Sequence, residues 1–245
     1  MSICIRYQFA TAKHRSEVGM AEVERRREKL RTWAGPGVEV DVGLPEDGPG
    51  SVESRTDAAL TVPEFLSNVV KAQRDGYDAV IVSCFSDPGM DAARELVSIP
   101  VLGSGICAMH IAAMLGGRFS IMAPGTGGGS RVYENPRKYG FADNYASTRG
   151  VGLSVMDLAK DRDATIDRIA DIGRQAVRED GADTLILGCM SMAFHDITTA
   201  LTDLIGVPVV NPVPASLGLA ETLVRSGLSH SRIAYPEPPR LNINF

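Results

Sequence analysis

Two cysteines, Cys84 and Cys189, end two stretches of this chain that repeat each other. Residues 76–84 read GYDAVIVSC and residues 181–189 read GADTLILGC, so a glycine, an aspartate, a largely apolar run and a small residue precede each cysteine. A thiol has an ordinary pKa of about 8.5, which is near enough to neutrality for it to accept and donate protons. Two thiols on either side of a substrate would move a proton between the two faces of a carbon.

Both repeats also continue in the same way. Each cysteine is followed by a segment long enough for a helix and then by a second short apolar run, IPVL at 99–102 and VPVV at 207–210. A chain that repeats a strand, ends it twice in a thiol and continues alike is typical of a duplicated half-domain. Two facing halves would bring Cys84 and Cys189 to one cleft.

Strands and helices alternate along the predicted fold. The hydrophobic pattern predicts strands at 3–7, 38–42, 79–83, 101–103, 119–122, 152–155, 184–187 and 207–210. It predicts helices at 14–33, 63–75, 87–97, 107–115, 164–179, 191–205 and 215–226. This alternation indicates an α/β protein with parallel sheets flanked by helices. Ligands bind beyond the carboxyl ends of such strands, where both repeated cysteines lie.

The residues after each cysteine can begin a helix. Asp87 is a suitable cap with Pro88 in the first turn, and Ser191 can play a similar part after Cys189. A helix N-terminus offers unpaired N–H groups and a partial positive charge, which favour a thiolate and can hold a substrate carbonyl as negative charge builds on it. No metal or cofactor is needed for that chemistry. The glycine-rich loop at 125–129 is either a connector or a lid over the cleft.

The composition is that of a globular chain, and we expect its partner to be a small-molecule substrate. At 245 residues, with 44% hydrophobic and 22% charged residues, the chain suits one large domain or two intimate halves. A net charge of −5 argues against nucleic acid or an anionic membrane as a partner. No apolar run approaches the roughly 18 residues of a membrane span, and we see no signal peptide, so we expect a cytoplasmic protein.

The other two cysteines have no evident chemical role. The four cysteines are widely spread and form no Cys-x-x-Cys pair, so their spacing predicts neither a zinc site nor a thioredoxin-like motif. In a reducing cytoplasm all four are expected to be free thiols. We expect Cys4 and Cys107 to be buried, inert packing residues.

Several motifs resemble those of one enzyme family. Residues 83–95, SCFSDPGMDAARE, are similar to the first cysteine motif of hydantoin and allantoin racemases, which belong to the aspartate/glutamate racemase superfamily. Residues 187–193, LGCMSMA, resemble the second cysteine motif. Further resemblances follow the family's order at 100–103, 108–110, 227–229 and 235–236.

The resemblance implies a two-lobed α/β fold with pseudo-symmetric halves, each a parallel sheet of the four-stranded type flanked by helices. The lobes would cover roughly residues 1–115, together with the C-terminal tail, and residues 116–225. Cys84 and Cys189 would flank the substrate, one thiolate removing the α proton and the opposite thiol returning one from the other face. Racemases of this type use neither pyridoxal phosphate nor metal, and relatives imply a homo-oligomer. The two motif cysteines count against the related arylmalonate decarboxylases, whose pattern keeps one.

The residues around the substrate depart from the family pattern. The family's first strand usually runs into Asn-Pro-Asn-Ser/Thr, where this chain has YQFAT at 7–11. A usual threonine pair is replaced by Ala123 and Pro124, and a common acidic residue by Ile106. The substrate is therefore expected to be a 5-substituted hydantoin, an allantoin-like compound or a less polar carbon acid. The residues expected to contact it are Tyr7, Phe9, Phe85, Ser86, Thr126, Met190 and Ser191.

Two other functions are compatible with these residues. One is a cis–trans isomerase or lyase of the same superfamily, in which Cys84 attacks an unsaturated acid and forms a covalent adduct. The other is a non-catalytic small-molecule sensor that has kept the fold. Mass spectrometry would detect the adduct, and two unreactive cysteines with ordinary pKa values would favour the sensor.

Overall fold

The chain forms two compact units in a computed structural model. The structure describes residues 2–15, 19–126, 129–154, 157–159 and 161–239. Of these, unit 1 contains the residues up to Ser104 and those from Ser216 onward, and unit 2 contains the residues between them. The chain therefore passes between the units within α4 (Ser104–Leu115) and α9 (Pro212–Arg225). The lobe boundaries predicted from the sequence, near residues 115 and 225, lie further along the chain than these two crossing points.

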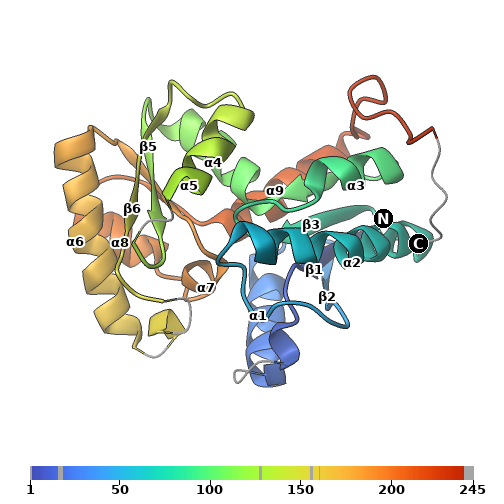
Figure 1. The fold of residues 1–245 in the computed structure, drawn as a ribbon, viewed down its shortest axis with the longest axis horizontal. Helices are drawn as coiled ribbons and strands as arrows, with labels where there is room; N and C mark the ends of the chain where they lie inside the picture. The colour runs from blue at the N-terminus through green and yellow to red at the C-terminus, as the bar shows by residue number, and fades with distance from the viewer. Residues whose placement is uncertain (1, 16–18, 127–128, 155–156, 160, 240–245) are drawn as a thin grey trace. The chain divides into compact units, whose positions relative to one another are not determined.

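Unit 1 is built on a parallel sheet with the strand order β2-β1-β3-β4. Its strands are β1 (Ile3–Phe9), β2 (Val38–Gly43), β3 (Ala79–Ser83) and β4 (Val101–Gly103). The helical segments described before α4 are η1 (Lys13–Arg15), α1 (Gly19–Trp33), α2 (Arg55–Arg74) and α3 (Met90–Leu96). Helix α1 packs against β2, and α2 packs against β1 and β3 (Figure 1). The apolar strands are thereby covered by helices.

Unit 2 is built on a second parallel sheet with the order β6-β5-β7-β8. Its strands are β5 (Phe119–Ala123), β6 (Tyr145–Gly150), β7 (Thr184–Leu187) and β8 (Val209–Val210). The helical segments described between α4 and α9 are α5 (Gly129–Lys138), η2 (Asp157–Ala159), α6 (Arg162–Asp180), α7 (Met190–Ala193) and α8 (Thr198–Ile205). Helix α6 packs against β5, β6 and α8, and the apolar residues of this layer form one core.

The two sheets have the same strand order and the same parallel pairing. This confirms the predicted fold class, an α/β protein with two parallel four-stranded sheets flanked by helices. Every residue of β7 is buried, and so is every residue of β3 except Ser83. Such burial is expected of parallel strands covered on both faces. The two repeated cysteines follow β3 and β7, which hold the same position in their sheets.

Helix α2 begins well before the predicted start at Pro63. The side chain of Ser54 accepts a hydrogen bond from the Asp57 N–H, and the Asp57 carboxylate accepts one from the Ser54 N–H. This reciprocal capping box starts the helix. Pro63 then lies inside the helix, where a proline costs about 3 kcal/mol. Burial of Phe65 and Val69 offsets that cost, since each buried side chain contributes about 1.5–3 kcal/mol.

The predicted strand at 152–155 is wrong. The strand of this region is β6, which ends at Gly150, and Gly152 has a φ of +74° that takes it out of an extended run. Residue 155 lies outside the described residues. Strand β6 reads YASTRG and is only partly buried along its whole length, so it lacks the apolar run that the sequence reasoning required. Polar partners hold it, including an ion pair between Arg149 and Asp180 at 2.6 Å.

The segment after Cys189 also differs from its prediction as one helix at 191–205. Helix α7 is a single turn that ends at Ala193, and α8 begins at Thr198. Asp196 lies between them with a φ of +56°, which breaks the helical path. The break buries Phe194 and Ile197 completely.

Within the described part of the chain, no helix is long and apolar enough to cross a membrane.

The residues after α9 bind back onto β4 and α3 of unit 1. The N–H of Val101 donates to Nε2 of His230 at 2.5 Å. Arg94 donates to the Tyr235 hydroxyl at 2.9 Å, and Arg232 donates to the main-chain oxygen of Val97. Hydrogen bonds therefore hold the tail to unit 1. One of them requires that Nε2 of His230 carries no proton.

Acid is expected to loosen this tail. Burial and the charges of Arg94 and Arg232 lower the pKa of His230 to about 4. A histidine whose folded pKa lies below its ordinary value stabilises the folded chain fully above pH ~6.5, and this contribution is lost as the pH falls toward about 4. For this partly exposed group we expect a loss of about 1–2 kcal/mol, measured by urea unfolding at a series of pH values. His230→Gln keeps an acceptor without a titrating group and should flatten this part of the profile; an unchanged profile in that variant contradicts the assignment.

Candidate active site

Cys84 follows the last residue of β3, at the carboxyl end of the unit 1 sheet. Its side chain is partly exposed, and its Sγ lies 3.2 Å from the hydroxyl oxygen of Ser86. The chain turns there, because the N–H of Asp87 donates to the main-chain oxygen of Cys84 at 3.1 Å. The thiol is therefore accessible at the sheet edge where parallel α/β proteins bind ligands.

Asp87 does not cap a helix, contrary to the prediction. Helix α3 begins at Met90, and its N-cap is Gly89, which has a φ of +73°. Asp87 instead has a φ of +49°, a conformation that L-residues rarely adopt, and it is only 3% exposed. It packs closely over Gly103, where a Cβ would lie 2.2 Å from the Asp87 Cγ. The turn after Cys84 is thereby fixed against the end of β4.

Cys189 holds the equivalent place in unit 2, after β7 and Gly188. Its side chain is partly exposed and its backbone is extended, with φ −150° and ψ 135°. Cys189 is itself the N-cap of α7, so Ser191 lies inside the turn and does not begin it as predicted. The N–H of Gly188 donates to the main-chain oxygen of Met122 at 2.8 Å. This bond ties the residue before the thiol to β5.

Two aromatic residues of β1 lie in the interior next to the end of β3. Tyr7 is 0% exposed and Phe9 is 2% exposed, and their rings meet edge-on with centroids 6.1 Å apart. Phe9 pairs with Ser83 in the parallel register, and the Arg26 guanidinium lies 5.8 Å from the centre of the Phe9 ring. Both were expected to contact the substrate. In this structure both side chains are buried, so neither presents an exposed surface.

The other residues expected at the substrate divide between the units. In unit 1, Phe85 and Ser86 are partly exposed in the turn after Cys84. In unit 2, Met190 and Ser191 follow Cys189 and are 7% and 6% exposed. Thr126 is exposed in the turn after β5. The loop at 125–129 was left open as a connector or a lid. Its residues 127 and 128 lie outside the described residues, and residue 129 begins α5, which the sequence reasoning did not predict.

Sequence reasoning missed three hydroxyl groups near the end of β3, those of Tyr7, Ser83 and Ser104. The Tyr7 hydroxyl is hydrogen-bonded to the side chains of Ser83 and Ser104, and the Ser104 hydroxyl donates to the Val82 main-chain oxygen at 2.9 Å. Burial raises the pKa of Tyr7 to about 12, so the phenol stays neutral near pH 7. The three hydroxyls come from β1, β3 and the start of α4, and no local sequence signal links them.

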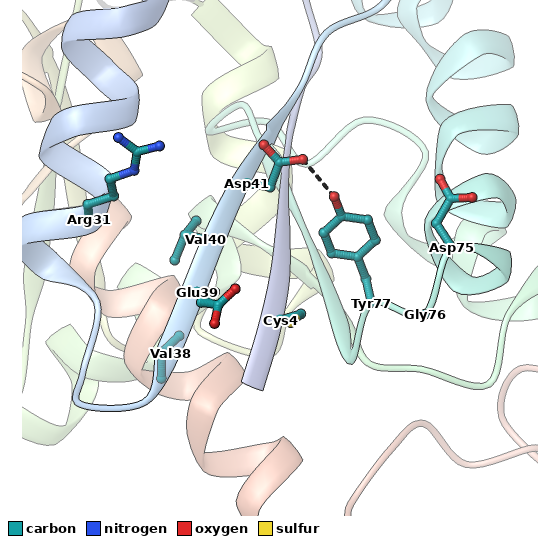
Figure 2. Close-up of a pocket in the computed structure, with 9 residues that line it drawn as sticks. All are labelled: Cys4, Arg31, Val38, Glu39, Val40, Asp41, Asp75, Gly76 and Tyr77. Carbon is teal, nitrogen blue, oxygen red and sulfur yellow. Dashed lines mark hydrogen bonds between the residues drawn. The ribbon is translucent and has the colours of Figure 1, made fainter. Parts of the chain in front are cut away.

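A surface pocket of about 650 Å³ lies at the other end of the unit 1 sheet (Figure 2). Most of its lining residues lie near the amino end of β1, in β2 and just before β3. Cys84 instead follows the carboxyl end of β3. Asp41 accepts hydrogen bonds there from Tyr77 at 2.6 Å and from Arg6 at 2.5 Å. The pocket is therefore separate from the candidate site. Its lining residues are Cys4, Arg31, Val38, Glu39, Val40, Asp41, Asp75, Gly76 and Tyr77.

The remaining cysteines do not join either thiol site. Cys107 is 3% exposed, as predicted, but Cys4 is partly exposed, so its predicted burial is wrong. Burial and the carboxylates of Glu39 and Asp78 raise the pKa of the Cys4 thiol, which keeps it protonated. Among the residues that the structure describes, no group of three or more His, Cys, Asp or Glu is arranged to hold a metal ion.

Comparisons with known proteins agree with the two-sheet fold and show which family the chain matches. The family model for Asp/Glu/Hydantoin racemase matches residues 18–220. A hydantoin racemase from Paenarthrobacter aurescens is 34% identical over 196 residues, covering 79% of this chain and 82% of that protein. A hydantoin racemase from Pseudomonas sp. (strain NS671) is 33% identical over 196 residues, covering 79% and 78%. The crystal structure of allantoin racemase from Pseudomonas fluorescens matches with a TM-score of 0.89 at 28% identity, covering 99% of this chain and 100% of that one.

Proposed function

Because the chain belongs to the Asp/Glu/Hydantoin racemase family, and is therefore a racemase and so an isomerase, we propose that Cys84 and Cys189 are its acid–base pair. The observation that supports this pairing is the equivalent placement of the two thiols. Each is partly exposed, and each follows the strand in the third position of a parallel sheet with the same strand order. The two units thus offer one proton-transfer group each, as a reaction on two faces of one carbon requires.

The proposed reaction is a proton transfer in two steps. One cysteine, as a thiolate, removes the proton from the stereocentre next to a carbonyl group, and the electron pair left behind spreads onto the carbonyl oxygen. The other cysteine, as a thiol, then gives its proton to the opposite face of the same carbon. The product is the other enantiomer, and the protonation states of the two cysteines are exchanged. General acid–base catalysis of this kind typically contributes about 10²–10⁴-fold to a rate.

The proposed substrate is a 5-substituted hydantoin, an allantoin-like compound or a less polar carbon acid of similar size. Two relatives that resemble this chain at 33% and 34% identity are named hydantoin racemases, which favours the first class. Phe85 and Ser86 are partly exposed beside Cys84, and they offer an apolar face and a hydroxyl to such a ring. We propose these two residues as substrate contacts in unit 1, with Met190 and Ser191 next to Cys189 in unit 2.

Racemisation in heavy water tests the proposal directly. Single enantiomers of 5-alkyl and 5-aryl hydantoins and of allantoin are incubated with the protein in D₂O. NMR follows loss of the proton at the stereocentre while chiral chromatography follows inversion. We expect the enantiomer formed to carry deuterium, because the cysteine that donates to the opposite face carries a deuteron taken from the solvent. Reactions without protein correct for spontaneous exchange.

Two outcomes would contradict the proposed mechanism. Inversion that retains the original proton would exclude transfer through two exchangeable thiols. A covalent adduct on Cys84 formed from an unsaturated acid, without exchange on any hydantoin, would identify the cis–trans isomerase or lyase. If no compound in the panel reacts or exchanges and both thiols resist alkylation, the sensor hypothesis is favoured instead.

A further inference from the structure

We propose that Asn211 is a positioning residue for Cys189, and that it acts through the single helical turn that begins at this cysteine. Asn211 follows β8 directly and is only 7% exposed, so it presents little surface to a substrate. It was not among the residues that the sequence reasoning singled out. The proposal rests on the proposed function of Cys189 and adds a residue that holds this thiol in place.

Two consecutive hydrogen bonds link Asn211 to Cys189. Nδ2 of Asn211 donates to the main-chain oxygen of Ala193 at 2.9 Å. The N–H of Ala193 in turn donates to the main-chain oxygen of Cys189 at 3.0 Å. On the other side of the thiol, the N–H of Gly188 donates to the main-chain oxygen of Met122. The main chain is therefore held both before and after Cys189.

Helix α7 is too short to keep its shape by its own hydrogen bonds. It has four residues, and a first helical turn is unfavourable by itself because several backbone angles must be fixed for its first hydrogen bond. The positive φ of Asp196 ends the helical path soon after the turn. Ala193 is the last residue of α7, and Cys189 is its N-cap. A tether at Ala193 therefore stabilises the turn at the end opposite the thiol.

The side-chain amide of Asn211 makes two different contacts. Its Oδ1 accepts a hydrogen bond from the N–H of Val213 at 3.0 Å, which caps the start of α9, while its Nδ2 donates to Ala193. Turning the amide over would bring two oxygens together at Ala193 and two N–H groups together at Val213. The orientation of the amide is therefore fixed. The cap and the tether are separate contacts, so a substitution can remove one and keep the other.

Unit 1 has a similar contact beside the other thiol. Ser104 follows β4 directly and is 0% exposed, and its hydroxyl donates to the main-chain oxygen of Val82, two residues before Cys84. Strands β4 and β8 hold the same place in their sheets. In each unit, a buried polar residue directly after this strand thus donates to the main chain near the cysteine. This recurrence supports a role for Asn211 at the thiol as well as in capping α9.

Asn211→Ser keeps the cap and removes the tether. Serine is as good an N-cap as asparagine, but its side chain is one bond shorter and does not reach Ala193. The Ala193 oxygen keeps its longer bond from the N–H of Asp196 at 3.3 Å. We expect deuterium exchange by Cys189, measured in the Cys84→Ser background, to slow by about 3- to 10-fold with KM within about twofold, as the loss of one hydrogen bond predicts. Exchange by Cys84, measured in the Cys189→Ser background, should be unchanged.

Asp161→Ala is the matched control. Asp161 caps α6 of the same unit by accepting a hydrogen bond from the N–H of Ala164 at 3.0 Å. Its replacement loses a cap in unit 2 and keeps the tether, so both exchange steps should be unchanged. Equal slowing of both steps by Asn211→Ser, or no slowing of either, would overturn the proposal, and so would equal slowing of the Cys189 step by Asp161→Ala. If Asn211→Ser does not fold, Asn211→Gly replaces it, because an N-cap position tolerates glycine almost as well.

A second measurement separates this proposal from the proposed function. Amide hydrogen exchange of the unaltered protein and of Asn211→Ser is followed by mass spectrometry without any substrate. We expect the peptide that covers residues 189–195 to exchange about 3- to 10-fold faster in the variant, while peptides of α6 and of unit 1 are unchanged. Unchanged protection of residues 189–195 overturns the tether even if racemisation is observed. Faster exchange confined to that peptide supports the tether even if no compound is racemised.

Discussion

Replacing either Cys84 or Cys189 with serine is expected to lower the rate of racemisation by about 10²–10⁴-fold. A serine hydroxyl has nearly the shape of a thiol, but its pKa lies far above 8.5, so it neither holds a negative charge near pH 7 nor gives up its proton readily. Because the two cysteines are partly exposed, the substitutions should leave the fold unchanged. Polarimetry with a single enantiomer, alongside circular dichroism of each variant, measures both effects.

The two serine variants are expected to fail in different ways. In Cys84→Ser, the remaining Cys189 can still remove the proton from one enantiomer and return a deuteron to the same face. In Cys189→Ser, the opposite enantiomer should exchange in this way. Each variant should therefore show deuterium exchange without inversion, and on different enantiomers. Exchange of the same enantiomer in both variants would contradict the assignment of one thiol to each face.

Cys4→Ser is the control for these variants. Cys4 is also a partly exposed thiol of unit 1, but it lies at the amino end of β1, and burial and nearby carboxylates raise its pKa. Its replacement should leave racemisation within about twofold of the unaltered protein, since surface changes away from a site have small effects. A large loss in Cys4→Ser would mean that the thiols do not act as assigned.

Gly188→Ala is expected to lower the free energy of unfolding by about 1–3 kcal/mol and to reduce turnover as well. A Cβ at Gly188 would lie 2.8 Å from the main-chain oxygen of Met122 and 2.6 Å from the Cγ2 of Ile121. Main-chain atoms cannot rotate away, so the β5–β7 contact must open. Cys189 is the next residue and would move with it. Urea unfolding and the racemisation rate measure the two losses.

Gly218→Ala provides the matched comparison. Gly218 lies in α9 with nothing within 4 Å of its Cβ position. Alanine is the better helix former, so this variant should gain up to about 1 kcal/mol and keep its turnover. If Gly188→Ala behaved like Gly218→Ala, the close approach of β5 would not be what positions Cys189.

The sequence alone predicted the buried parallel strands that carry the thiols and the position of each thiol. Buried parallel strands are continuous apolar runs, and β3 and β7 read as such, so Cys84 and Cys189 could be placed at their carboxyl ends without any contact information. Strand β6 was missed for the same physical reason. Its residues are polar and only partly buried, and a pattern method finds a strand only where burial imposes a pattern.

Helix boundaries were predicted less well because several signals competed. Pro63 suggested a helix start, but the capping box at Ser54 begins the helix earlier and tertiary burial of Phe65 keeps it continuous through the proline. Asp87 also suggested a helix start, but its positive φ places its carboxyl group over Gly103 instead. Capping preferences act over a few residues, and packing from a different strand can override them.

Only the tertiary structure decided what surrounds Cys84. Tyr7, Ser83 and Ser104 are distant in sequence, and each is unremarkable in its own segment. They meet near the end of β3 because β1 pairs with β3 and because Ser104, at the start of α4, donates to the main-chain oxygen of Val82. Pairing and burial are long-range properties. The sequence therefore pointed to the two thiols that we propose as the acid–base pair, whereas the fold determined which residues lie around the strand end that carries Cys84.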